Sequence, residues 1–146
     1  MGAAELAQLL ATGQIEQVRA DPETAREEIE TARRHIAAAA VISELDPTLA
    51  FTGLYDAIRK AIQAHMRANG YRISKGPGGH VKTGGYALAA LDHLEIGEHL
   101  EEFDTLRIVR NQSEYGALFV AEDDVENARR HAGTIVEAVA VSLLTP

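Results

Sequence analysis

The sequence predicts an all-α protein: an up-and-down four-helix bundle with a short extra helix at its N-terminus. Apolar residues recur three or four positions apart over several long segments, which is the period of an amphipathic helix. Asp-Pro pairs and glycines stand at the ends of these segments, where helices begin and end. No segment alternates between apolar and polar residues over a length typical of a strand. These observations favour helices packed on helices around one core.

The chain of 146 residues is predicted to form a single domain, with residues 1–20 as the leading helix and 21–145 as the bundle. A chain of this length buries roughly 70% of its unfolded surface. It contains no cysteine, which excludes thiol nucleophiles and thiolate metal sites. Its apolar runs are shorter than the roughly 20 residues that a membrane span requires. We therefore expect a cytoplasmic protein with no membrane partner.

Residues 3–11 are predicted to form the leading helix, with Gly13 as its stop signal. Asp21 followed by Pro22 is typical of a helix N-cap and first helical position, so a second helix begins there. Its apolar stripe continues to Ser43, and its opposite face is charged. We interpret that charged face as a solvated surface.

The Asp-Pro signal recurs at Asp46, where a third helix begins, and Gly70 ends it. A fourth principal helix covers about residues 98–115. The last helix is predicted to begin with a capping box of Asp123 and Glu126. The residues predicted to face the core from the third helix are Phe51, Leu54, Tyr55, Ile58, Ile62 and Met66. Those from the last helix are Val125, Ala128, Ala132, Ile135, Val136, Val139 and Leu143.

The fourth helix carries an arginine where a core residue is expected. Phe103, Leu106, Val109 and Arg110 recur at helical spacing and share one stripe. A buried charge without a partner costs several kcal/mol. Arg110 must therefore pair with a group such as Glu114, one turn further on, or face a cleft or a subunit interface where an anion binds.

Arg110 and Asn111 are followed by Tyr115 and Gly116, and they come after a helix that contains YDAIRKA at residues 55–61 and a glycine-rich connection. This arrangement resembles the HEPN domain family. The family consists of small all-α bundles, many of which are metal-independent ribonucleases of toxin–antitoxin and phage-defence systems. The resemblance implies the same fold and an activity toward RNA.

The family motif is an arginine, often followed by asparagine, then four to six residues and a histidine. Arg110 and Asn111 match its first half, whereas Tyr115 stands where the histidine is expected. The resemblance covers about residues 21–140 and implies a homodimer in which two copies of the motif meet at one cleft. In HEPN toxins paired with a nucleotidyltransferase antitoxin, a tyrosine near the motif accepts adenylate, and Tyr115 is the candidate here.

Metal-free RNA cleavage needs a base for the ribose 2′-hydroxyl, an acid for the leaving oxygen and positive charge at the phosphate. Arg110 suits the contact with phosphate, and Asn111 suits its orientation. Tyr115 completes the predicted catalytic set as a hydrogen-bond donor or stacking partner, because a pKa near 10 makes tyrosine a poor base. No cofactor or metal is predicted, since the chain lacks the Glu-x-x-His spacing of di-iron bundles.

Residues 57–91 hold six basic side chains and no acidic one, although the whole chain carries a net charge of −8. The Debye length of about 8 Å lets such a local patch attract phosphates in an acidic protein. Alternatively, the acidic second helix packs against this segment. The predicted substrate-binding residues are Arg72, Lys75, His80 and Lys82 in this segment and Arg107 on the fourth helix.

Residues 70–85 are predicted to form a glycine-rich surface loop. A nucleotide-triphosphatase loop is not predicted, because no glycine directly precedes Lys82 and no strand precedes the loop. His80 is the best alternative proton carrier. The histidines predicted to lie on a surface or at an interface are His35, His65 and His131.

The sequence thus supports three hypotheses. The first is a ribonuclease of the toxin or defence type, in which Arg110 binds the phosphate. The second is a HEPN domain that has lost cleavage and binds RNA, a nucleotide or a nucleotidyltransferase partner, which Tyr115 in place of the motif histidine favours. The third is a structural dimer in which Arg110 pairs with Glu114.

Overall fold

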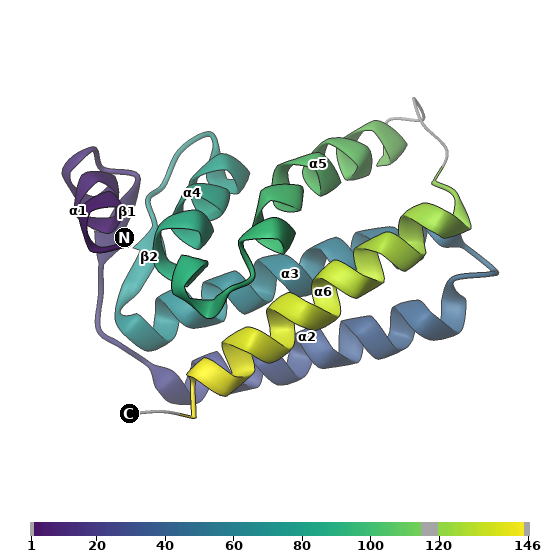
Figure 1. Cartoon of the computed structure of the whole chain (residues 1–146), viewed down its shortest axis with the longest axis horizontal. Helices are drawn as coiled ribbons and strands as arrows, with labels where there is room; N and C mark the ends of the chain where they lie inside the picture. Colours follow the sequence, from purple (N-terminus) through teal and green to yellow (C-terminus); the bar gives the residue numbers. More distant parts are fainter. Residues whose placement is uncertain (1, 115–119, 145–146) are drawn as a thin grey trace.

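The computed structural model describes residues 2–114 and 120–144, and the side chains of all of these except residues 113 and 114. This part of the chain folds into six α-helices, one short 3-10 helix and a two-stranded ribbon (Figure 1). The helices are α1 (Gly2–Ala11), α2 (Pro22–Ile42), α3 (Pro47–Asn69), α4 (Gly79–Leu91), α5 (Gly97–Glu114) and α6 (Glu122–Ser142). The 3-10 helix η1 (Asp92–Leu94) lies between α4 and α5. None of the described helices has the length and apolar character of a membrane span.

Helix α3 is at the centre of the molecule, where it packs against α2, α4, α5 and α6. Figure 1 shows α2, α3 and α6 running alongside one another, with α4 and α5 on one side of them. All six residues of α3 that were predicted to face the core are buried. The prediction of an all-α helical bundle is confirmed.

The predicted N-caps of α2 and α3 are confirmed. The Asp21 carboxylate accepts a hydrogen bond from the backbone N–H of Thr24 at 3.1 Å, and the Asp46 carboxylate accepts one from Leu49 at 3.0 Å. A proline follows each aspartate at the first helical position, where its missing N–H costs nothing. Gly70 ends α3 in the left-handed conformation, as expected.

The predicted capping box of the last helix is wrong. Helix α6 begins at Glu122, and the Asp124 carboxylate accepts a hydrogen bond from the backbone N–H of Ala121 at 3.0 Å. Glu126 instead forms an ion pair with Arg129, one turn along the helix. Three acidic residues occupy the first turn, so the sequence alone offers several carboxylates that could cap the helix. The position at which the helix begins makes Asp124 the one that bonds to the backbone.

The predicted loop at residues 70–85 is also wrong, because this region contains a strand and the start of a helix. Strand β2 (Tyr71–Ile73) pairs antiparallel with β1 (Ile15–Gln17). Helix α4 then begins at Gly79. Glycines lower helix propensity, and for this reason the sequence did not predict α4. One of them, Gly84, allows α5 to approach closely, since a Cβ there would lie 3.3 Å from the Phe103 ring.

Two histidines predicted to lie on a surface or at an interface are buried. His65 is 9% exposed and His131 is 2% exposed. Each is accommodated by a polar partner, because an unpaired buried polar group is costly. Nδ1 of His65 lies 2.8 Å from the Tyr86 hydroxyl, and Nδ1 of His131 lies 2.8 Å from Nδ1 of His99.

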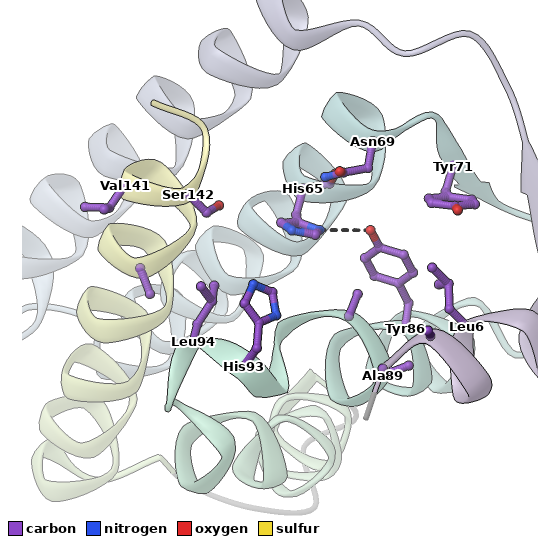
Figure 2. A pocket seen from close by; sticks show the side chains of 14 residues that line it. Leu6, His65, Asn69, Tyr71, Tyr86, Ala89, His93, Leu94, Val141 and Ser142 are labelled. Carbon is purple, nitrogen blue, oxygen red and sulfur yellow. Dashed lines mark hydrogen bonds between the residues drawn. The ribbon is translucent and has the colours of Figure 1, made fainter. Parts of the chain in front are cut away.

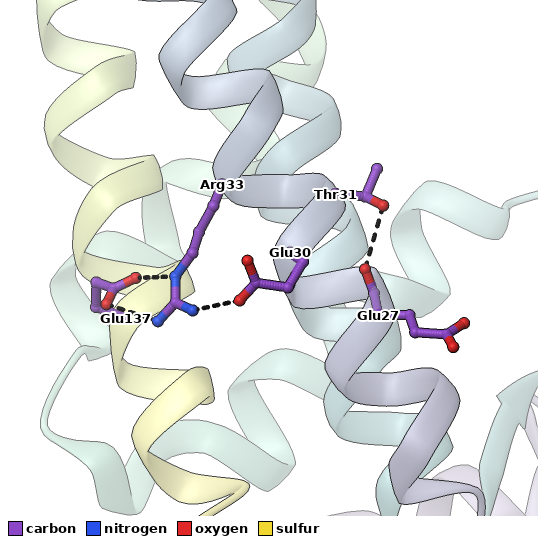
Figure 3. Close-up of polar contacts among 5 residues, drawn as sticks. All are labelled: Glu27, Glu30, Thr31, Arg33 and Glu137. Carbon is purple, nitrogen blue, oxygen red and sulfur yellow. Dashed lines mark hydrogen bonds and ion pairs between the residues drawn. The ribbon is translucent and has the colours of Figure 1, made fainter.

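The charged outer face of α2 is linked to α6 through Arg33 (Figure 3). Its Nε and Nη2 atoms donate to the two carboxylate oxygens of Glu137 at 2.9 and 3.0 Å, and Nη1 donates to Glu30 at 2.6 Å. The hydrogen bonds to Arg33 hold the pKa of the Glu137 carboxyl below its usual value. This solvated face therefore also joins two helices, although exposed pairs of this kind contribute at most about 1 kcal/mol.

Replacing Gly70 with alanine is expected to destabilise the protein more than replacing Gly13. Both glycines have positive φ, 82° and 73°, but a Cβ at Gly70 would lie 2.9 Å from the Val18 carbonyl oxygen, whereas the space around Gly13 is open. We expect Gly13→Ala to cost about 1 kcal/mol from backbone strain alone and Gly70→Ala about 3 kcal/mol. Denaturant unfolding of the two variants measures the difference, and equal losses would contradict the tight contact at Gly70.

Candidate functional site

Arg110 lies near the end of α5, and its partly buried side chain reaches the central helix α3. Its Cζ atom is 5.3 Å from the centre of the Tyr55 ring, within the range of a cation–π contact. Its Nη1 atom donates a hydrogen bond to Oδ1 of Asn111 at 3.3 Å. The two predicted catalytic residues Arg110 and Asn111 therefore bond to each other, and Arg110 lies against Tyr55. Tyr115 lies outside the described residues, as does the side chain of Glu114.

Tyr55 connects α3 to the start of α4. It is 1% exposed, yet its hydroxyl lies 2.6 Å from Nδ1 of His80. His80 is the second residue of α4, directly after Gly78 and Gly79, and Gly78 adopts the left-handed conformation that starts this helix. The Phe103 ring of α5 stacks on Tyr55 with 5.3 Å between ring centres. This packing holds the phenol in place, so the hydroxyl presents a rigid partner to His80.

Three arginines lie close enough to this hydrogen bond to act on it electrostatically. Arg59 follows Tyr55 by one turn of α3, and Arg107 precedes Arg110 by one turn of α5. The positive charges of all three lower the pKa of both Tyr55 and His80. We call Tyr55, Arg59, His80, Arg107 and Arg110 the arginine cluster. Its residues come from helices α3, α4 and α5, and each helix supplies a charged or hydrogen-bonding side chain.

Burial keeps the central groups of the cluster uncharged, and the arginines add to this effect only for His80. Burial raises the pKa of Tyr55 to about 12, against the opposing effect of the arginines. For His80, burial and the arginines act in the same direction and lower its pKa below the usual 6.5. His80 is therefore a neutral imidazole at neutral pH. Where its Nδ1–H donates to the Tyr55 oxygen, its Nε2 atom carries a lone pair that can accept a proton.

Arg59 and Arg107 each have a carboxylate partner on their own helix. Arg59 lies 3.3 Å from Asp56, and Arg107 lies 2.9 Å from Asp104. Both pairs are partly exposed, with 64% of the Asp104 side chain accessible, and such pairs are weak. A phosphate group, which can contact a guanidinium group in bidentate geometry, can take the place of these weakly held carboxylates.

The remaining predicted substrate-binding residues make their contacts elsewhere. Arg72 on β2 forms an ion pair with Glu16 on β1 at 2.8 Å. The Lys82 Nζ atom lies 3.5 Å from the backbone oxygen of Ser74, and Lys75 is exposed between β2 and α4. The structure thus places Arg107, His80 and Arg110 near one another, while Arg72 contacts the ribbon and Lys82 contacts Ser74, the residue after β2.

Tyr55 and Arg59 were not predicted as site residues. Tyr55 was correctly predicted to face the core, but that prediction ignored its hydroxyl. The available signal was the spacing, because Tyr55 and Arg59 are four residues apart and so share one face of α3. A buried tyrosine needs a partner for its hydroxyl, and a histidine 25 residues away supplies it.

Comparison of the chain with protein-family models, with curated proteins and with solved structures gave no match. The function must therefore follow from the chemistry of the side chains. The arginine cluster combines guanidinium groups with a neutral imidazole and a buried phenol. This combination suits an anionic ligand with a proton to lose, which is the chemistry of a phosphodiester beside a hydroxyl group.

Proposed function

We propose that the protein is a HEPN-like domain that binds RNA through the arginine cluster. The observation that supports this most directly is that Arg59, Arg107 and Arg110 all act electrostatically on the hydrogen-bonded pair of Tyr55 and His80, with Arg110 lying over the Tyr55 ring. Guanidinium groups bind phosphate oxygens in bidentate geometry. The cluster occupies helices α3, α4 and α5, and it includes the arginine of the motif that resembles the HEPN family.

In this proposal His80 takes the role of the histidine that the motif lacks. Its Nε2 atom accepts the proton of the ribose 2′-hydroxyl, and the 2′-oxygen then forms a bond to phosphorus. The bond from phosphorus to the 5′-oxygen breaks, and that oxygen takes a proton from water. Arg110 and Arg107 balance the charge that develops on the phosphate. The products are a 2′,3′-cyclic phosphate and a free 5′-hydroxyl, and the reaction needs no metal.

A second proposal is a domain that binds RNA, or a nucleotidyltransferase partner, without cleavage. Asp56 and Asp104 favour it, because their charges reduce the net positive charge of the cluster. Tyr115 in place of the motif histidine favours it as well.

Under either proposal we place two copies of the chain in a homodimer with their Arg110 residues at one cleft. Sedimentation velocity measures the assembly, and a monomer at working concentration would contradict that arrangement.

The decisive experiment incubates purified protein with labelled single-stranded RNA in the presence of EDTA. We expect His80→Ala to reduce cleavage at least about 100-fold, the usual contribution of a positioned proton carrier, and to leave RNA affinity within about threefold of wild type. His35→Ala on α2 is the matched control and should cleave normally. Salt-sensitive binding without cleavage by the wild type supports the second proposal. Absence of both binding and cleavage would overturn the first proposal and RNA binding under the second.

A further inference from the structure

A pocket of about 740 Å³ lies between the leading helix and the end of the bundle (Figure 2). Its walls come from α1, the last turn of α3, β2, α4, η1 and the last turns of α6. This volume is in the range of sites that hold small organic molecules, roughly 300 to 1,000 Å³. No residue of the arginine cluster lines it. The pocket is therefore a separate feature of the molecule.

The centre of the pocket wall is a hydrogen-bonded group of uncharged side chains. Nδ1 of His65 lies 2.8 Å from the Tyr86 hydroxyl, and the side-chain amide of Asn69 donates to the backbone oxygen of His65 at 2.8 Å. Among the described residues, the structure gives no hydrogen-bond partner to Nε2 of His65 or to Oδ1 of Asn69. Two adjacent residues of the wall thus retain polar atoms for a ligand.

Burial keeps this group neutral. It lowers the pKa of His65 to about 4 and raises that of the Tyr86 hydroxyl above its usual value. The described residues that line the pocket include no Asp, Glu, Lys or Arg. An anionic ligand would lose hydration there without a lysine or arginine as counter-ion, and a cationic ligand without a carboxylate, which costs several kcal/mol. The lining therefore selects against ions.

Aromatic rings form much of the remaining surface. The Tyr86 ring lies between His65 and Tyr71, with ring centres 5.8 and 6.1 Å away. Figure 2 shows the His93 ring projecting toward His65 from the opposite wall, with Leu6 and Leu94 beside these rings. Rings and aliphatic side chains around a few polar atoms suit a flat molecule with an apolar body and one hydrogen-bonding end.

We infer that this pocket binds an uncharged aromatic molecule of small size, whose donor and acceptor groups pair with His65, Asn69 and Tyr86. Helix α1 supplies one wall through Leu6 and neighbouring small residues. Gly2 allows it to approach α4 closely, since a Cβ there would lie 2.0 Å from the Ala89 carbonyl oxygen. A bound ligand contacts both helices and so stabilises the docking of α1 on α4.

A pair of probes of nearly equal shape tests the inference. Indole-3-acetamide is uncharged, whereas indole-3-acetate carries one negative charge at neutral pH. We expect titration of the ¹⁵N-labelled protein with the amide to shift the backbone signals of Asn69, Tyr71 and Ala89 in a saturable manner. The acetate is expected to bind at least about tenfold more weakly, because the lining has no lysine or arginine to receive it. Absence of saturable shifts with the amide, or equal binding of the acetate, would overturn the inference.

Variants locate the bound probe. Ala3 lines the pocket and is exposed, so Ala3→Trp fills the space without disturbing the core and should weaken amide binding at least about tenfold. Ala4 is also exposed but lies outside the lining, and Ala4→Trp is the matched control. Tyr86→Phe removes one polar group from the wall and should weaken binding about fivefold or more. Unchanged affinity in both Ala3→Trp and Tyr86→Phe would contradict this location.

Discussion

Arg110→Ala is expected to weaken binding of single-stranded RNA roughly tenfold to hundredfold, the effect of removing a charge-assisted contact with phosphate. Arg110 is held over the Tyr55 ring and bonded to Asn111, so it is already ordered before a ligand arrives. Ordering a long side chain only upon binding would reduce the free energy gained. The loss on removing Arg110 should therefore exceed that for a mobile surface arginine.

The salt dependence of binding makes this prediction specific. Each phosphate contact on a single strand contributes about 0.7 to the slope of log affinity against log salt. Arg110→Ala should lower the slope by about this amount, whereas Arg110→Lys should retain the slope but lose part of the affinity, because lysine cannot make the bidentate contact. Arg129→Ala is the matched control, since this exposed arginine of α6 pairs only with Glu126 among the described residues. Unchanged affinity and slope in Arg110→Ala would contradict the site.

Acid is expected to remove about 3 kcal/mol of stability through His65 alone. The pKa of His65 is about 4 in the folded protein, because burial disfavours its charged form, and 6.5 is its ordinary value. The unfolded chain therefore binds a proton at a higher pH than the folded protein. The stabilising contribution is fully present above pH 6.5 and is lost as the pH falls to about 4.

The difference between two unfolding curves isolates this effect. Burial also lowers the pKa values of His80 and His131, so the wild type loses stability in acid from several groups at once. His65→Gln removes one titrating group. The free energy of unfolding of the wild type should therefore fall by about 3 kcal/mol more than that of the variant between pH 6.5 and pH 4. The ring signals of His65 in an NMR titration provide a direct check. Titration of His65 near its ordinary pKa would refute the prediction.

The helices with strong local signals were predictable from sequence. Asp21 and Asp46 cap their helices through bonds to residues three positions away, and Gly70 ends α3 at its own left-handed φ. All of these interactions involve neighbours in the chain. Helix α4 was not predictable in this way, because Gly79, Gly84 and Gly85 oppose it locally and packing against its neighbours supports it.

Only part of the candidate site could be predicted from the sequence, for the same reason. Spacing along α5 singled out Arg110, and charge singled out Arg107 and the basic segment, but charge alone did not separate Arg59 from Arg72. The structure separates them, since Arg72 faces Glu16 on the neighbouring strand while Arg59 lies one turn from Tyr55. Composition describes how much charge a segment carries, whereas the fold determines which charges meet.

The sequence by itself determined the all-α class, the caps of α2 and α3 and the buried stripes of α3 and α6. These follow from hydrogen bonds within one turn and from the period of the helix, which neighbouring residues specify. The tertiary structure decided that His80 meets Tyr55, and that His65 meets Tyr86. Those partners are 25 and 21 residues apart, so their contacts depend on how α4 packs against α3. Each buried hydroxyl or imidazole group needs a hydrogen-bond partner, and this need favours the one packing arrangement that supplies it.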